Sequence, residues 1–307
     1  MSFPADSPSR SYRLKGEEES AAGVRRIATG RAEKATEELR DTDADFAGSI
    51  HGARKDLKKL RSVLRLVRED LGEDLFRTEN RRYRDAGRLL SGSRDAEVKL
   101  QTVLELRRHF QADFPYGASG PWTRTLERER DRASGATGSG PGPQVERARA
   151  AIEEGRELIA DWPLGADSWR LVRPGLARSY REGRRALRRT LADPSAENVH
   201  RWRKRAKDLW YQLLVLHDAW PDVLGATADQ AHELTDLLGD HHDLAVLRED
   251  LTGRDAIDER EAFETLIERR QAELLAAAVE IGARLYAEKP KAFNRRMRAC
   301  WDAWRGE

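Results

Sequence analysis

The sequence predicts an all-α protein built from two helical bundles that are related by a pseudo-two-fold axis and enclose a basic central groove. Apolar residues recur at steps of three, four and seven along most of the chain, which places them on one face of a helix. No segment alternates apolar and polar residues as a half-buried strand does. One basic pattern also occurs twice, once in each half, which indicates an internal duplication.

The first half of the chain is predicted to hold five helices. The first spans about 17–41 and opens with acidic residues, which suit the positive end of a helix. The second spans about 45–71, and its buried seam is formed by Ile50, Leu57, Leu60, Leu64, Val67 and Leu71. Three more helices are expected at about 73–91, 94–110 and 121–132, with breaks at Gly72 and Gly92.

A stretch rich in glycine and proline at 134–143 is predicted to be the linker between the halves, because this composition does not suit a regular element. The predicted organisation is therefore a polar segment at 1–16, a first helical half at 17–133 and a second at 144–305. Beyond the linker, helices are expected at about 144–161, 167–192, 195–218, 221–239, 241–251, 256–287 and 290–305.

The overall charge is nearly balanced, with 56 Lys and Arg against 54 Asp and Glu. Any binding of a polyanion must therefore come from the arrangement of the charges. A single cysteine, Cys300, excludes an internal disulfide framework and a site of several thiolates, which suits a reducing interior. No uncharged stretch approaches the roughly 20 residues of a membrane span. We therefore expect a cytoplasmic protein without a membrane partner.

Two basic strips carry the functional prediction. The first strip is His51, Arg54, Lys55 and Lys58, and the second strip is His200, Arg203, Lys204 and Lys207. In both, the offsets 0, 3, 4 and 7 place the side chains on one helical face, where they repel one another unless an anion lies above them. The histidines would gain charge near their ordinary pKa of about 6.5. Further candidates on the same or flanking helices are Arg61, Arg25, Arg26, Arg181 and Arg184.

A second landmark follows each strip at nearly the same distance. Asp95 lies 44 residues after His51, and Asp243 lies 43 residues after His200. Each aspartate follows a pair of leucines by the same spacing. The matching separations indicate a repeated unit of several helices, and we expect the two strips to face one shared groove. The aspartates are expected to cap helices that start after a break, or to pair with an arginine.

These residues resemble the CHAD domain family. The pattern H-x-x-R-K-x-x-K followed by L-L-x-x-x-x-D, present in both halves of an all-helical chain, is similar to that family over about residues 11–305. The resemblance implies two related helical bundles that bind inorganic polyphosphate on a basic central surface without hydrolysing it. It thus implies a binding protein with no cofactor and no metal. Recruitment to polyphosphate granules in the cytoplasm is one role compatible with such binding.

An enzymatic alternative is a metal-dependent phosphohydrolase of the HD type. His200, His232 and the adjacent His242 and Asp243 supply a similar set of ligands on helices. The repeat argues against this reading, because Arg84 and Arg94 occupy the equivalent positions in the first half and cannot bind a metal.

Two binding alternatives use the same cations. A nucleic-acid backbone would bind to a basic groove and is expected to compete with polyphosphate at low salt. A helical adaptor for an acidic protein would depend on apolar anchors as well as on charge. Whatever the ligand, the alternative for His51 and His200 is that they are helix caps or interface residues and do not bind an anion.

Overall fold

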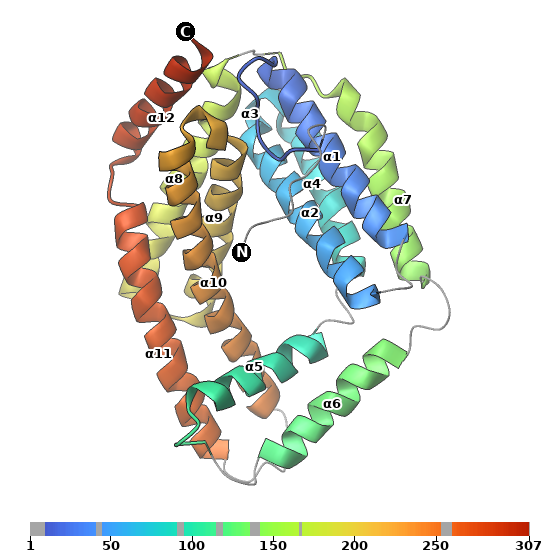
Figure 1. Cartoon of the computed structure of the whole chain (residues 1–307), viewed down its shortest axis with the longest axis vertical. Helices are drawn as coiled ribbons and strands as arrows, with labels where there is room; N and C mark the ends of the chain where they lie inside the picture. The colour runs from blue at the N-terminus through green and yellow to red at the C-terminus, as the bar shows by residue number, and fades with distance from the viewer. Residues whose placement is uncertain are drawn as a thin grey trace.

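The computed structural model describes residues 10–40, 45–90, 95–114, 119–135, 142–165, 168–252 and 260–306. These residues form α-helices and short 3₁₀ turns without a β-strand (Figure 1), so the predicted all-α class is confirmed. The helices are α1 Ser20–Arg40, α2 Phe46–Leu66, α3 Arg68–Leu71, α4 Glu73–Leu89, α5 Asp95–His109, α6 Ser119–Gly135, α7 Pro143–Leu158, α8 Trp169–Ala192, α9 Ala196–Val215, α10 Pro221–Thr252, α11 Arg260–Leu285 and α12 Pro290–Arg305.

Helix α10 runs without a break through Gly239 and Asp240, where the sequence predicts two helices. The prediction is wrong because one glycine inside a helix costs only about 1 kcal/mol, which packing along the rest of α10 offsets. Asp243 therefore lies in a helix interior. Our expectation that it caps the start of a helix is wrong. The matching residue of the first half, Asp95, begins α5, and its side chain is outside the described residues.

The main body has two sides that share one core. Helices α1, α2, α4 and α7 form one side, and α8, α9, α12 and the first part of α10 form the other (Figure 1). Leu60 of α2 and Trp202 of α9 are both buried in this core. Helix α7 follows the predicted linker but packs against α1 and α4, since its apolar face is buried there. The packing thus does not follow the expected division at 134–143, and residues 136–141 lie outside the described ranges.

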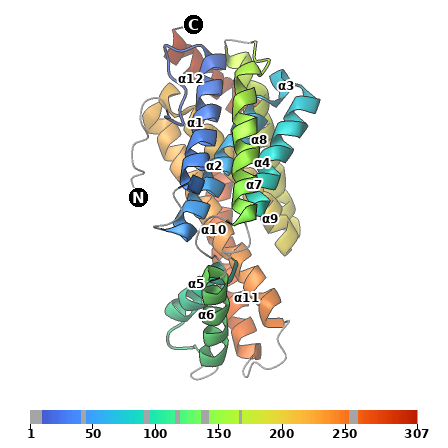
Figure 2. The ribbon, with the colours of Figure 1, turned by 90° about the vertical axis from the view of Figure 1, so that its right-hand side faces the viewer.

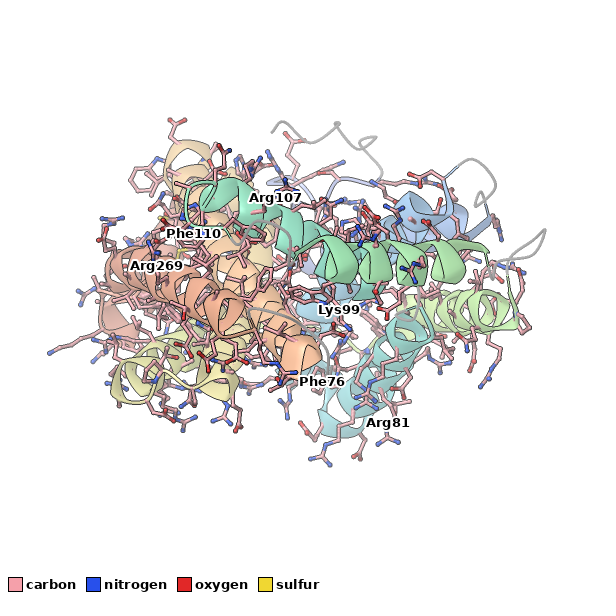
Figure 3. All side chains as sticks on the ribbon, turned by 90° about the horizontal axis from the view of Figure 1, so that it is seen from below. Phe76, Arg81, Lys99, Arg107, Phe110 and Arg269 are labelled. Carbon is pink, nitrogen blue, oxygen red and sulfur yellow. The ribbon has the colours of Figure 1, made fainter. Side chains whose placement is uncertain are left out.

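A smaller core forms a distal lobe at one end of the body (Figure 2). The lobe consists of α5, α6, the end of α10 and the start of α11. Its buried residues include Phe110, Trp122 and Phe263. Arg269 of α11 lies over the ring of Phe110, which directly follows α5, and is 4.8 Å from its centroid (Figure 3). Both sequence halves contribute to both cores, so the two cores do not correspond to the two halves. The predicted internal duplication therefore stays a prediction.

The two sides of the body meet most closely where α2 crosses α8 and α9. A Cβ atom at Gly175 of α8 would lie 2.1 Å from the backbone oxygen of Leu66 of α2. Nearby, the hydroxyl of Ser62 donates a hydrogen bond of 3.2 Å to the carbonyl of Asp208 of α9. Since a backbone carbonyl cannot rotate away as a side chain can, Gly175 sets the separation of the two sides.

Replacing Gly175 by Ala is expected to lower the free energy of unfolding by about 3 kcal/mol, because the new methyl group overpacks a rigid contact. Urea unfolding followed by circular dichroism measures this loss. The matched control is Gly87→Ala in α4, where the added Cβ would meet only Leu57 Cδ1, at 3.7 Å. That variant should gain about 0.5–1 kcal/mol from the lower flexibility of the unfolded chain. Equal effects of the two substitutions would contradict the close crossing.

Candidate anion-binding site

The structure brings Lys58 of the first strip and Arg203 of the second strip close together. The pKa of Lys58 is lowered to about 8, first by the loss of surrounding water and then by the positive charges of Arg54, Arg203 and Arg61. The side chain still reaches solvent. Asp243 of α10 is also near and acts in the opposite direction. The charge of Arg203 on α9 therefore acts directly on a residue of α2.

A residue of the second strip, Lys204 on α9, is in turn affected by a cation of α2. Burial lowers the pKa of Lys204, and so do the charges of Arg205 on the same helix and of Arg61 on α2. Lys204 is exposed, as Lys58 is. Cations from both halves of the chain thus lie within electrostatic reach of one another at one place on the molecule.

Helix α4 positions the arginines of α2. Arg54 donates a hydrogen bond of 2.9 Å from Nη1 to the carbonyl of Leu90, the C-cap residue of α4. Arg61 donates one of 3.0 Å from Nε to Oδ1 of Asn80. Because a guanidinium carries five N–H donors in a rigid fork, one such bond orients the group and leaves further donors for phosphate oxygens.

Helix α4 also supplies two cations that were not among the predicted anion-binding residues, Arg84 and Arg88. Burial lowers the pKa of Arg61 to about 10, and the charges of Arg65, Arg84 and Arg88 act in the same direction. Arg84 and Arg88 both pair with Asp85, at 2.8 Å and 3.5 Å. Their helical spacing was visible in the sequence, but the contact between α2 and α4 was not. We call the set Arg54, Lys58, Arg61, Arg84, Arg88, Arg203 and Lys204 the cationic cluster.

Two histidines border the cationic cluster between α9 and α10. The rings of His200 and His242 lie 4.4 Å apart with an angle of 31° between their planes. Burial lowers the pKa of His200 to about 4, and His242, Lys204 and Arg203 add to the effect. In the free protein His200 is therefore neutral at pH 7. We had expected His200 to gain charge near pH 6.5, but in this environment it does so only at lower pH.

The remaining strip residues lie in other surroundings. His51 is exposed near the start of α2. Lys55 faces α1, where its charge acts on Glu38, whose pKa burial raises to about 7. Lys207 lies with its Nζ 5.8 Å from the centroids of both the Trp210 and Tyr211 rings. The four residues of a strip therefore do not all face the same surroundings, and only some of them belong to the cationic cluster.

Three of the four flanking arginines hold chain segments together. Arg25 donates to the carbonyls of Trp162 and Leu164, at 2.7 Å and 3.3 Å. Arg26 binds Glu18 at 2.5 Å and also donates to the carbonyls of Ser11 and Arg13. Arg184 donates to the carbonyl of Tyr286 at 3.0 Å, and Arg181 is exposed on the same helix. The structure does not bring Arg25, Arg26 or Arg184 together with the cationic cluster.

The ligand set of the HD-type alternative is not assembled in the described part of the chain. His232 pairs through Nδ1 with Asp236 at 3.0 Å, and its ring packs against Trp210 at 4.1 Å. Of the four residues, only His200 and His242 are found in ring contact with each other, with their centroids 4.4 Å apart. Among the described residues, no group of three or more His, Cys, Asp or Glu side chains is placed to hold a metal ion. Over the same residues, no helix has the length and apolarity needed to cross a bilayer.

Comparisons with known proteins agree with this architecture. A family model of the CHAD domain matches residues 26–252, a range that includes both strips. The crystal structure of the CHAD domain from the plant Ricinus communis is similar, with a TM-score of 0.61 and 18% sequence identity. The similarity covers 93% of this chain and 98% of that chain, and at this identity it shows the fold alone. A comparison with curated proteins finds no match.

Proposed function

Because the chain belongs to the CHAD domain family, we propose that it binds inorganic polyphosphate on the cationic cluster. The observation that carries this proposal is the effect of Arg203 on the pKa of Lys58, because the two residues come from opposite halves of the chain. A linear polyanion that lies across α2 and α9 would contact both residues at once.

The physical support is the cost of gathering like charges. The lowered pKa of Lys58 means that its ammonium form is disfavoured, first by the loss of surrounding water and then by the repulsion of the neighbouring guanidinium groups. A bound chain of phosphates would relieve this repulsion and would also release its condensed counterions. Polyphosphate suits such a cluster because its negative charges are dense and its backbone is flexible. Charge density, and not the recognition of a particular base or side chain, would therefore determine the preference.

We propose a binding role without catalysis. Lys and Arg side chains from α2, α4 and α9 make up the cationic cluster, and these groups hold phosphates by charge-assisted hydrogen bonds. Hydrolysis needs an activated water molecule as well, for which an HD-type site would use clustered metal ligands. Binding of this kind would also recruit the protein to polyphosphate granules in the cytoplasm.

Calorimetric titration with three ligands tests the proposed function. Polyphosphate is expected to bind more tightly than single-stranded DNA of the same phosphate count, and an acidic peptide should bind weakest. The DNA should compete only at low salt. A phosphate-release assay on the same samples, with Mg²⁺ present, should detect no product. The proposal fails if the DNA or the peptide binds as tightly as polyphosphate, and release of phosphate would show a hydrolase instead.

The affinity for polyphosphate is expected to stay constant below about pH 8 and to decrease at higher pH. Free Lys58 loses its proton above about pH 8, whereas bound phosphate favours the ammonium form and raises the pKa of this residue. Between the pKa of the free form and that of the bound form, each pH unit lowers the affinity by up to about tenfold.

Titrations from pH 6.5 to 9.5 at constant ionic strength measure this dependence. Lys58→Arg should weaken the decrease above pH 8, since the pKa of a guanidinium lies well above that of an ammonium group in the same place. Lys55→Arg is the control from the same helix, one turn away and facing Glu38, and it should keep the decrease. An identical profile for both variants would remove Lys58 from the binding site.

A further inference from the structure

Lys58 and Lys207 occupy the same position in the two strips, but Lys207 lies beside aromatic rings and Lys58 lies beside other cations. Lys207 has two aromatic rings within 5.8 Å of its Nζ, and the negative face of a ring favours an ammonium group. Lys58 is exposed, and Arg54 and Arg61 lie one helical turn to either side of it on the same face of α2. The charge of Arg203 reaches it from α9. Its neighbour in sequence, Lys59, lies 4.0 Å from the carboxylate of Asp56. Of these three lysines, Lys58 has the surroundings that most favour the neutral amine.

A neutral amine is a nucleophile, whereas an ammonium group is not. Because its pKa is lowered to about 8, a far larger share of the Lys58 side chains is neutral at pH 8 than is usual for a lysine. A lysine with its ordinary pKa of about 10.4 would be neutral in well under 1% of molecules at that pH. Solvent access leaves room for a small electrophile to approach the Nζ atom.

The groups that surround Lys58 also bind phosphate. Arg54 is oriented by its hydrogen bond to Leu90, and Arg203 lies over Gly239, with Nη2 at 3.4 Å from the position of a Cβ there. Guanidinium groups bind phosphoryl oxygens with two parallel hydrogen bonds. A small molecule that joins a phosphate to an electrophilic carbon would therefore be held with its phosphate on the arginines and its carbon near Nζ.

We propose that Lys58 is a site of acylation by acyl phosphates, a class of which acetyl phosphate is the simplest member. The lone pair of Nζ attacks the acyl carbon and forms an amide bond. The bond between that carbon and the phosphate oxygen breaks, and inorganic phosphate leaves with the bonding electrons. The proton of Nζ passes to water, so no oxidant or reductant is needed. The arginines stabilise the charge that develops on the leaving phosphate.

Acylation would also control the proposed function, on which this part of the inference rests. The amide product is uncharged, so the modification removes a cation from the centre of the cationic cluster. Since hydrogen bonds to charged groups contribute more than neutral ones, the affinity for polyphosphate should decrease by about tenfold or more. Bound polyphosphate in turn would cover Lys58 and slow its acylation.

The test is to incubate the full chain with acetyl phosphate at pH 8 and to follow each lysine by peptide mass spectrometry. The reference residue is Lys291, which is exposed on α12. A parallel reaction with an uncharged acetyl ester separates amine reactivity from phosphate recognition. Lys58 should react at least ten times faster than Lys291 with acetyl phosphate, and its advantage should be smaller with the ester. Polyphosphate should slow the reaction of Lys58 and leave that of Lys291 unchanged.

Equal rates at Lys58 and Lys291 would overturn the inference. An advantage of Lys58 that is the same for both reagents would also overturn it, because recognition of the phosphate would then play no part. If Lys58 keeps its preference for acetyl phosphate while polyphosphate gives no protection, the acylation site is supported and the proposed function is wrong.

Discussion

Reversing two charges at once, with Lys58→Glu and Arg203→Glu, is expected to lower the affinity for polyphosphate by at least about a hundredfold. Each substitution removes charge-assisted hydrogen bonds to phosphate, which contribute about 1.5–3 kcal/mol, and adds a repelling carboxylate. The two residues lie on α2 and α9, so the double variant removes cations on both sides of the proposed binding path. Calorimetric titration measures the loss.

The dependence on salt provides a second readout of the same variant. The slope of log affinity against log salt concentration should flatten by about 0.7–0.9 for each phosphate that is no longer neutralised. The control is Lys291→Glu with Arg295→Glu, which makes the same change in net charge at exposed positions of α12. Far-ultraviolet circular dichroism should show unchanged helicity in both variants. If the α12 control loses as much affinity, net charge rather than the cationic cluster governs binding.

The substitution Asp56→Ala is expected to lower the free energy of unfolding by about 3–5 kcal/mol. Asp56 forms a salt bridge of 2.9 Å with Arg31, and the two side chains are only 3% and 0% exposed. Removing the carboxylate takes a salt-bridge partner from a fully buried guanidinium, and the cost is far larger than the net contribution of an ion pair at the surface. Denaturation by guanidinium chloride measures the loss.

A paired substitution separates the buried charge from the packing of the site. Arg31→Met combined with Asp56→Leu removes both charges and fills a similar volume, so its stability should stay within about 2 kcal/mol of the natural protein. The outcome that would refute this explanation is a double variant as unstable as Asp56→Ala. Such a result would show that the shape of the pair, and not its charge, stabilises the contact between α1 and α2.

The predicted helices agree with the structure wherever local signals decide. Pro290 begins α12, and the break at Gly72, which has a φ of 76°, lies between α3 and α4 as expected. The predicted break at Gly239 failed because α10 contributes to both cores, with Leu238 in one and Leu247 in the other. The glycine destabilises a helix by only about 1 kcal/mol, and burial of a single leucine side chain stabilises by about 1.5–3 kcal/mol, so packing prevails.

The candidate site was predicted less completely than the helices. The repeated spacing identified Arg54, Lys58, Arg203 and Lys204, which the structure does bring together. The same spacing could not show that Lys207 lies beside aromatic rings. It also could not show that Arg84 and Arg88 approach α2, because these contacts join residues far apart in sequence.

The sequence by itself determined the helical class and the presence of two cationic helix faces, because the helical period and the charge of a residue are local properties. Only the tertiary structure decided which cations share a site, since that depends on how α2, α4, α9 and α10 pack. It also decided how far the charged form of each basic side chain is disfavoured, because the pKa of a side chain is set by its neighbours and by the water that they exclude.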